Sequence, residues 1–218
     1  MIKASTLAFL KAIKENNNKE WMDANRKAYE AAKQNYEDFT TEMIQGFVSF
    51  EPTFADLTAK QCTFRLNRDI RFSQNKAPYK SNFGAAFSRG GKKSPYADYY
   101  FQLEPGNSFV AGGLWMPPAD RLKAVRQEID YDLPGFEKIL QQKDFKKLFP
   151  SMDGEQLKTA PQGYSIDNPA IPYLRFKSFT VLHHLSDKTV SGKDFPQELL
   201  AMFKTMKPFM DFLNRSVE

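Results

Sequence analysis

The stretch that decides the fold class is residues 96–115, which read YADYYFQLEPGNSFVAGGLW. Two mostly apolar and aromatic runs, 96–103 and 108–115, are joined by the turn sequence EPGN at 104–107. Strands joined by so short a turn pair antiparallel, because a parallel pair needs a crossover of a dozen or more residues. The stretch therefore predicts a β-hairpin and, with it, an antiparallel sheet.

Two further strands are predicted upstream of the hairpin. Residues 82–88 form an apolar run, and residues 64–72 alternate apolar and polar side chains. Alternation with a period of two residues is typical of a strand that buries one face. It places Arg65, Asp69 and Arg71 together on the polar face of the expected strand.

Arg68 is the exception to this alternation, since strict parity places it on the apolar face. Either a bulge at Asn67-Arg68 resets the register, which is the reading we prefer, or Arg68 is buried and paired with a carboxylate. Asp69 and Asp98 are available partners for the second reading. A bulge beside a charged cluster is a common feature of functional sites.

Helical periodicity brackets the predicted sheet on both sides. In chain order, the expected elements are helices at 6–13 and 21–43, a helix opening at 117–120, short helices at 136–140 and 145–148, a strand at 179–185 and a helix at 196–214. This order predicts an α+β fold with a central antiparallel sheet. We expect a single domain over 1–218, with helices in 5–47, the sheet in 60–115, and helices and a final strand in 117–218.

Composition sets the class of protein. The 218 residues include 41% hydrophobic residues and 20 phenylalanines, too many for a disordered chain and enough for one sizeable core. No window approaches the ~18 consecutive apolar residues of a membrane span, so no membrane partner is expected. The single cysteine, Cys62, excludes an intramolecular disulfide and a cysteine-based zinc cluster. The apolar run 4–10 is interpreted as a helix rather than a signal peptide, which predicts a cytoplasmic location.

Positive charge is concentrated in residues 65–93. This stretch holds eight lysines and arginines against one acid, Asp69, for a charge of +7; the whole chain has +5, so the other residues together carry −2. A run of charge is usually a solvated face. Here the expected strand would hold guanidinium groups in place, which favours a preorganised anion site.

The candidate site residues come from this stretch and from the end of the hairpin. Asp69 is the candidate catalytic residue, and as the sole acid among basic groups it is expected to have a lowered pKa. Pro78 stiffens the loop that presents Tyr79 between two lysines. The predicted ligand-binding residues are Arg65, Arg68, Arg71, Ser73, Lys76, Tyr79, Lys80 and Trp115.

These residues also lead to an expected geometry. Tyr79 should be at least partly exposed with its hydroxyl directed to the basic patch, and Trp115 should form a wall nearby. The side-chain nitrogens expected to converge on one concave patch are those of Arg65, Arg71, Lys76 and Lys80.

No metal or cofactor is predicted. His183 and His184 are the only histidines, and adjacent residues of a strand point to opposite faces, so they cannot bind one ion together. Residues 90–94, GGKKS, resemble part of a phosphate-binding P-loop but lack its first glycine and the Ser or Thr directly after its lysine.

The pattern RxxRDIRFSxxKxPYK over 65–80 resembles the signature of a mainly bacterial family, domain of unknown function 2461. The similarity extends over nearly the whole chain and includes GGLWxP over 112–117. Its other matching positions are Asn16-Asn17, Trp21, Arg126, Pro161-x-Gly163-Tyr164 and Leu174-x-x-Lys177. The resemblance implies an uncharacterised bacterial protein and brings no activity or cofactor with it.

Two classes of function remain open. In the first, the basic face binds a phosphate-bearing or other anionic ligand, such as a nucleotide or a nucleic acid. Whether the protein also converts that ligand is left open. In the second, the Arg/Asp cluster is a structural ion-pair network on a non-enzymatic protein-interaction module. Rings that could stack on bases in the first case are Tyr79, Tyr96, Tyr99, Tyr100 and Trp115.

Overall fold

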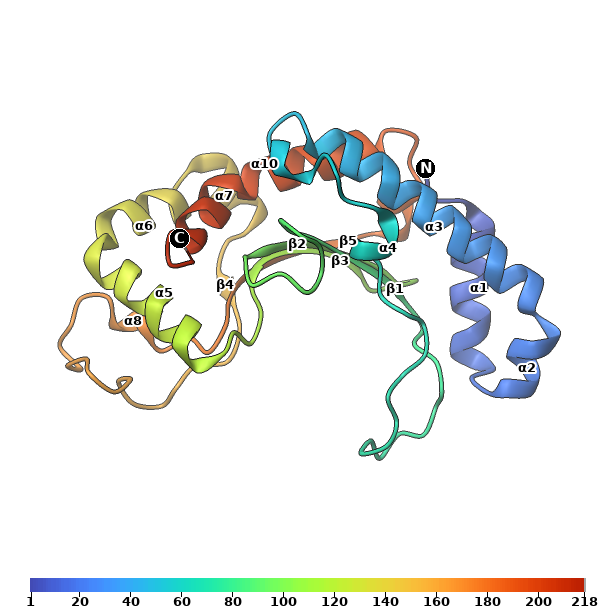
Figure 1. Ribbon diagram of the computed structural model, residues 1–218, viewed down its shortest axis with the longest axis horizontal. Helices are drawn as coiled ribbons and strands as arrows, with labels where there is room; N and C mark the ends of the chain where they lie inside the picture. The colour runs from blue at the N-terminus through green and yellow to red at the C-terminus, as the bar shows by residue number, and fades with distance from the viewer. Residues whose placement is uncertain (218) are drawn as a thin grey trace. The chain divides into compact units, whose positions relative to one another are not determined.

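The computed structural model describes residues 1–217 and has an α+β fold, which confirms the predicted class (Figure 1). Five strands form one antiparallel sheet in the order β1-β2-β3-β5-β4. The strands are β1 (Phe83–Phe87), β2 (Asp98–Leu103), β3 (Ser108–Leu114), β4 (Met152–Asp153) and β5 (Phe179–Leu185). The helices are α1 (Ala4–Glu15), α2 (Lys19–Ala24), α3 (Arg26–Phe47), the 3₁₀ turn η1 (Pro52–Phe54), α4 (Ala59–Cys62), α5 (Ala119–Tyr131), α6 (Leu133–Leu140), α7 (Lys143–Leu148), α8 (Ile171–Leu174), α9 (Asp187–Val190) and α10 (Phe195–Asn214).

The chain groups into two compact units, each assembled from several stretches. The first unit comprises Met1–Lys93, Tyr100–Val110 and His184–Leu200. The second comprises Ser94–Tyr99, Ala111–His183 and Ala201–Glu218. The prediction that one domain covers the whole chain stays a prediction.

In the first unit, α3 lies on one face of the strands. The ring of Tyr36 stacks on Phe83 and Phe101 with centroids 5.3 and 6.2 Å away, and its hydroxyl donates to the Phe101 carbonyl. The ring of Phe39 lies 5.7 Å from that of Phe195 and nearly parallel to it. Along β2, buried residues alternate with half-buried ones, so the helices cover one face and leave the Tyr100 face less covered.

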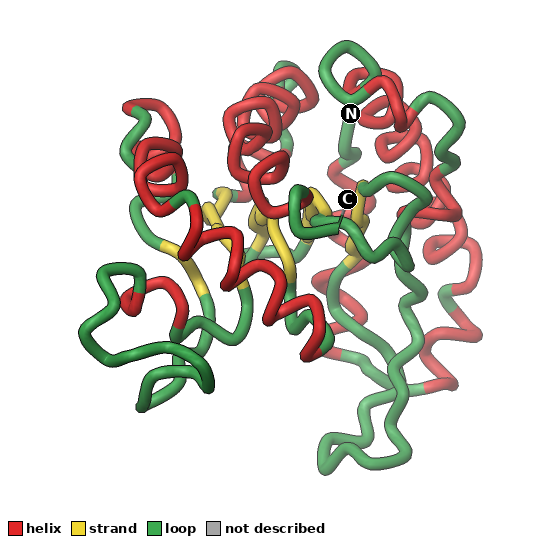
Figure 2. The backbone as a smooth tube through the Cα atoms, turned by 60° about the vertical axis from the view of Figure 1, so that its left-hand side comes forward, coloured by secondary structure: helices red, strands yellow, loops and turns green. Residues whose placement is uncertain are grey.

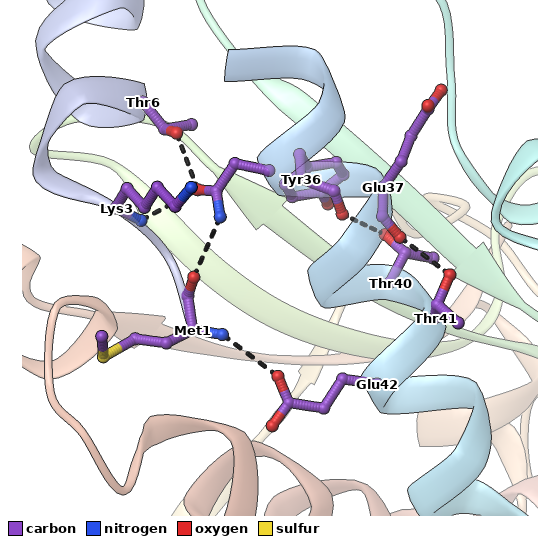
Figure 3. A network of polar contacts seen from close by, with 9 residues as sticks. Met1, Lys3, Thr6, Tyr36, Glu37, Thr40, Thr41 and Glu42 are labelled. Carbon is purple, nitrogen blue, oxygen red and sulfur yellow. Dashed lines mark hydrogen bonds and ion pairs between the residues drawn. The ribbon is translucent and has the colours of Figure 1, made fainter. Parts of the chain in front are cut away.

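A buried amide fixes the start of the chain against α3. The Asn35 side-chain oxygen accepts hydrogen bonds from the Lys3 backbone and the Thr6 hydroxyl, and its amide donates to the Met1 carbonyl (Figure 3). Glu42 on the same helix forms an ion pair with the Met1 amino group. This buried amide with three hydrogen bonds orients α1 against α3, because burying it unbonded would be unfavourable.

In the second unit, α6 and α7 pack on the end of α10. The ring of Phe136 lies 5.0 Å from Phe212 and 6.1 Å from Phe209, and Phe145 also contacts Phe209. Gly112 of β3 faces α10, where a Cβ atom would lie 2.7 Å from the Met206 sulfur. Small residues on the strand therefore allow the helix to approach the sheet.

Two predicted elements differ in the structure. The helix expected over 21–43 is two helices, because the chain leaves helical geometry at Asn25, whose side-chain amide donates to the Trp21 carbonyl. The prediction of a strand over 64–72 is wrong: the sheet begins at β1 and reaches beyond residue 115 to β4 and β5. The hairpin and the strand at 179–185 are confirmed.

The failed strand has a geometric cause. Isolated bridges join Thr63 to Ala85 and Asn67 to Tyr79. Four residue steps separate the bridges on the outgoing arm and six on the returning arm, so the two arms fall out of register between them. A continuous ladder cannot form across that mismatch, and the alternation of side chains does not produce a strand.

Candidate functional site

Five of the eight basic residues of 65–93 lie on a long excursion between α4 and β1, residues 63–82, here called the basic loop. It extends away from the strands in Figure 1 and is drawn as loop throughout in Figure 2. Backbone hydrogen bonds link its two arms at a few points: Phe64 N–H to Gly84, Lys80 N–H to Leu66 and Arg68 N–H to Pro78.

The tip of the basic loop is held by its own side chains. The guanidinium of Arg68 donates to the Ala77 carbonyl at 3.0 Å and to the Ser73 hydroxyl at 3.3 Å. The Lys76 ammonium donates to the Ile70 carbonyl at 3.2 Å. Arg68 is therefore half-buried, and within residues 1–217 it has no carboxylate partner and lies on no bulged strand, so neither of the two expected placements is correct.

Asp69 and Arg71 form an exposed, two-point ion pair. The Arg71 Nε and Nη2 atoms lie 3.0 and 2.7 Å from the two carboxylate oxygens of Asp69. The hydrogen bonds from Arg71, with a smaller contribution from Arg65, hold the pKa of Asp69 below its usual range. The predicted lowered pKa is confirmed, and Asp69 is ionised at neutral pH. Its catalytic role stays a prediction.

Tyr79 is fixed through its backbone and not through its ring. The Asn17 side chain accepts from the Tyr79 N–H at 3.0 Å and donates to the Tyr79 carbonyl at 2.9 Å. The side chain is partly exposed, as predicted, and its hydroxyl makes no hydrogen bond within residues 1–217. Asn17 thus ties the returning arm of the basic loop to the turn after α1.

Replacing Asn17 should loosen the basic loop. Asn17→Ala removes two hydrogen bonds at about 0.5–1.5 kcal/mol each, so we expect a loss of about 1–3 kcal/mol in the free energy of unfolding. Urea unfolding measures this loss, and limited proteolysis should show faster cleavage within 63–82. Asn16→Ala, which removes a bond to Ala12 only, is the matched control. Equal cleavage of the two variants would contradict the anchoring role.

An aromatic row follows the less covered face of the first unit. Phe64 meets Tyr100 edge-on at 6.2 Å, Tyr100 lies 5.7 Å from Phe109, and Phe109 lies 6.2 Å from His184. The Tyr100 ring lies over Gly84 of β1, where any Cβ atom would collide with the Tyr100 hydroxyl. The glycine therefore makes room for the ring and not for an outside ligand.

This row corrects the expected stacking residues. Tyr99 is buried and its ring contacts Phe203, so it faces the core. Sequence reasoning missed Phe64, Phe109 and His184 as members of the row. Alternation along the hairpin could have identified Phe109. Its two neighbours, Ser108 and Val110, are buried, so Phe109 between them lies on the opposite, less covered face of the strand.

Cations surround Phe64, which is 39% exposed. The ammonium groups of Lys80 and Lys92 lie 5.6 and 5.9 Å from its ring centroid, within the range of cation–π attraction. Lys92 is held structurally, because it donates to the carbonyls of Lys60 and Thr63. Lys80 makes no such bond within residues 1–217.

Arg65 and Lys80 are two positive side chains close enough to affect each other, although Arg65 also acts on the Asp69 carboxylate. Partial burial and the nearby charge of Arg65 lower the pKa of Lys80. Neither side chain forms an ion pair with an acid within residues 1–217. Two like charges held near each other are unfavourable, and an anion bound between them would relieve that repulsion.

A chain of polar side chains continues from the aromatic row. The Tyr100 hydroxyl donates to Gln102 at 3.2 Å, and the Gln102 amide donates to Glu104 at 2.8 Å. The Ser81 hydroxyl donates to the other oxygen of Glu104 at 2.9 Å. The Glu104 carboxylate thus accepts hydrogen bonds from neutral side chains, and within residues 1–217 it forms no ion pair with Lys80.

The other predicted site residues are not brought together with this surface. Ser73 and Lys76 are used within the tip, and Arg71 is paired. Trp115 is 65% exposed and belongs to the second unit, so its role as a wall beside Tyr79 stays a prediction. The ligand-binding roles of all eight residues also stay predictions.

A family model described as a conserved hypothetical protein, DUF2461, matches residues 5–212. The chain belongs to the DUF2461 family. This confirms the resemblance drawn from the motifs. No curated protein and no solved structure matches the chain.

Within residues 1–217 no group of three or more His, Cys, Asp or Glu side chains is placed to hold a metal ion, and no helix is long and apolar enough to cross a bilayer. His183 contacts the Leu148 carbonyl, whereas His184 packs on Phe109. Burial raises the pKa of the Cys62 thiol to about 11, so it is a poor nucleophile at neutral pH.

Proposed function

We propose that this protein binds a phosphate-bearing ligand, specifically single-stranded nucleic acid, through the aromatic row and the Arg65–Lys80 pair. The observation that carries the proposal is the position of the Lys80 ammonium, 5.6 Å from the ring centroid of Phe64, at one end of a row of rings. Phosphate would neutralise the cations while bases stack on the rings. Single-stranded nucleic acid combines these two features at a spacing of a few ångströms.

The row supplies the stacking part of the affinity. Successive ring centroids lie about 6 Å apart, and each ring is fixed by its strand or by backbone bonds of the basic loop. Base stacking on an aromatic side chain contributes about 1–3 kcal/mol per base. Because every base has a π-face, this arrangement favours binding with weak sequence preference.

A structural role for part of the cluster is supported by separate contacts. Arg68, Lys76 and the Asp69–Arg71 pair bind groups within the tip of the basic loop and shape it. These contacts suit the second candidate function, a protein-interaction module whose loop is braced by ion pairs. The two candidate functions depend on different side chains. Nucleic-acid binding requires Arg65, Lys80 and Phe64, whereas the protein-interaction module requires the residues at the tip of the basic loop.

Fluorescence anisotropy with labelled oligonucleotides of about 12 nucleotides tests the proposal. We expect Phe64→Ala to weaken binding about 5- to 150-fold, as the loss of one stacked base predicts. Lys80→Gln should lower the slope of log K against log salt by about 1, because one phosphate contact is lost. Lys27→Gln, an exposed lysine on α3, is the matched control and should leave both quantities unchanged.

The same titrations can overturn the proposal. Equal salt slopes for Lys80→Gln and Lys27→Gln would mean that binding is diffuse attraction to a basic protein. Unchanged affinity in Phe64→Ala would remove the stacking role. Urea unfolding of each variant distinguishes a lost contact from a lost fold.

A further inference from the structure

The second unit contains an open cavity of about 370 Å³ that takes no part in the proposed nucleic-acid surface. Its walls come from three separate stretches of the chain. The lining residues are Met116, Pro117, Leu122, Arg126, Leu157 and Lys177. The volume falls within the range of small-molecule sites, roughly 300–1,000 Å³.

The cavity combines apolar walls with two cations. Met116, Pro117, Leu122 and Leu157 supply carbon surface, whereas Arg126 and Lys177 are the charged members, and no acid is among the lining residues. A pocket that is mostly apolar with a few placed polar groups is the usual form of a small-ligand site.

Arg126 is a preorganised donor. Its Nε donates to the Leu174 carbonyl at 2.7 Å and its Nη2 to the Phe176 carbonyl at 3.0 Å. These bonds fix the guanidinium plane, and Nη1 makes no hydrogen bond within residues 1–217. Partial burial lowers the pKa of Arg126, yet a guanidinium remains charged at any ordinary pH. A fixed charge with an unused donor is suited to an anionic group.

Lys177 adds a second, adjustable charge. Its ammonium donates to Glu155 at 2.8 Å, and both side chains are well exposed. An exposed pair of this kind is weak and can exchange its partner for a ligand.

Backbone strain marks the same cavity. Met116 has φ 44°, the one positive φ at a residue other than glycine within residues 1–217. Its N–H donates to the Ser178 hydroxyl at 2.9 Å, and its side chain is nevertheless 71% exposed. A bulky residue rarely adopts this conformation, and such strain is concentrated at ligand sites.

We propose that this cavity binds a small organic anion, an anionic head group on an apolar body of a few carbons. Arg126 receives the head group with help from Lys177, and the four apolar residues receive the body. Carboxylate and phosphate head groups share this chemistry. The site uses no residue of the nucleic-acid surface, so either proposal can fail alone.

Amide NMR titration of the full chain with hexanoate, hexyl phosphate and hexan-1-ol tests the site. We expect shifts centred on Leu122, Arg126 and Lys177, with at least one anion bound about tenfold more tightly than the alcohol. The tighter anion identifies the head group. Equal binding of all three ligands, or shifts centred elsewhere, would overturn the proposal.

Two variants separate binding from folding, since Arg126 itself braces two carbonyls. Lys177→Gln should weaken anion binding severalfold, whereas Lys123→Gln, an exposed lysine beside Leu122 on α5, should not. Leu122→Trp fills the cavity while keeping both cations and should abolish binding in a folded protein. Unaltered hexanoate or hexyl phosphate binding by Leu122→Trp would also contradict the site.

Discussion

Gly113→Ala is expected to destabilise the second unit more than any other single substitution considered for this chain. Gly113 has φ 131°, a conformation that residues with a Cβ atom rarely adopt. A Cβ atom there would also collide with the Phe179 carbonyl oxygen and lie 2.9 Å from the Thr180 Cα. Both obstacles are backbone atoms of the neighbouring strand, so β3 and β5 would have to separate.

The expected loss is above about 4 kcal/mol, in the range of severe backbone and packing mutations. Gly163→Ala is the matched control: Gly163 also has positive φ, at 90°, but a Cβ atom there meets nothing within 4 Å. This control carries only the conformational cost of about 1–2 kcal/mol. Urea unfolding and far-UV circular dichroism measure both variants. A similar loss in the two would mean that β5 does not pack on Gly113 as described.

Asp98→Asn should stabilise the protein in a pH-dependent manner. Asp98 lies on β2, half-buried, with no hydrogen bond or ion pair to its carboxyl within residues 1–217. Burial raises its pKa from 3.8 to about 7. The folded state therefore holds a proton that the unfolded state releases, and stability falls as the pH rises from about 4 to about 7.

The difference between these pKa values corresponds to a loss of about 4 kcal/mol in the free energy of unfolding, once the pH is high enough to ionise Asp98 in both the folded and the unfolded state. Asparagine cannot ionise. The free energy of unfolding of Asp98→Asn should therefore exceed that of the parent by almost nothing at pH 4, by an increasing amount between pH 4 and 7, and by a constant amount above pH 7. Urea unfolding across this range measures the gain. The control is Asp167→Asn, at an exposed aspartate of the same unit. Its free energy of unfolding should differ from that of the parent by the same amount at every pH. A gain at pH 8 no larger than at pH 4 would contradict the burial of the Asp98 carboxyl.

Much of the fold could be predicted because its signals are local. The hairpin over β2 and β3, the strand at 179–185 and the last helix follow from periodicity and turn residues within short windows. The basic loop could not be predicted, because its conformation depends on distant partners. The bridge from Asn67 to Tyr79 and the Asn17 anchor set its course, and no local pattern encodes them.

The same distinction holds for the candidate site. The excess of charge in 65–93 identified the region, and the position of Asp69 predicted its lowered pKa. Which cations are used internally depends on the carbonyls at Ala77, Ile70 and Thr63, which are visible only in three dimensions. The alternation over 64–72 predicts Phe64 on the buried face of a strand, whereas in the structure the broken ladder leaves its ring beside Lys80.

The central claim, that single-stranded nucleic acid binds on the aromatic row beside Arg65 and Lys80, is tested most directly by NMR of the complex. Isotope-labelled protein is titrated with an unlabelled oligouridylate at low salt. The account predicts the largest amide shifts at Lys80, Tyr100 and Phe109, and nuclear Overhauser contacts from the Tyr100 ring to ribose protons. Contacts confined to α3 or to the exposed tip of the basic loop, or no shifts at low salt, would contradict it.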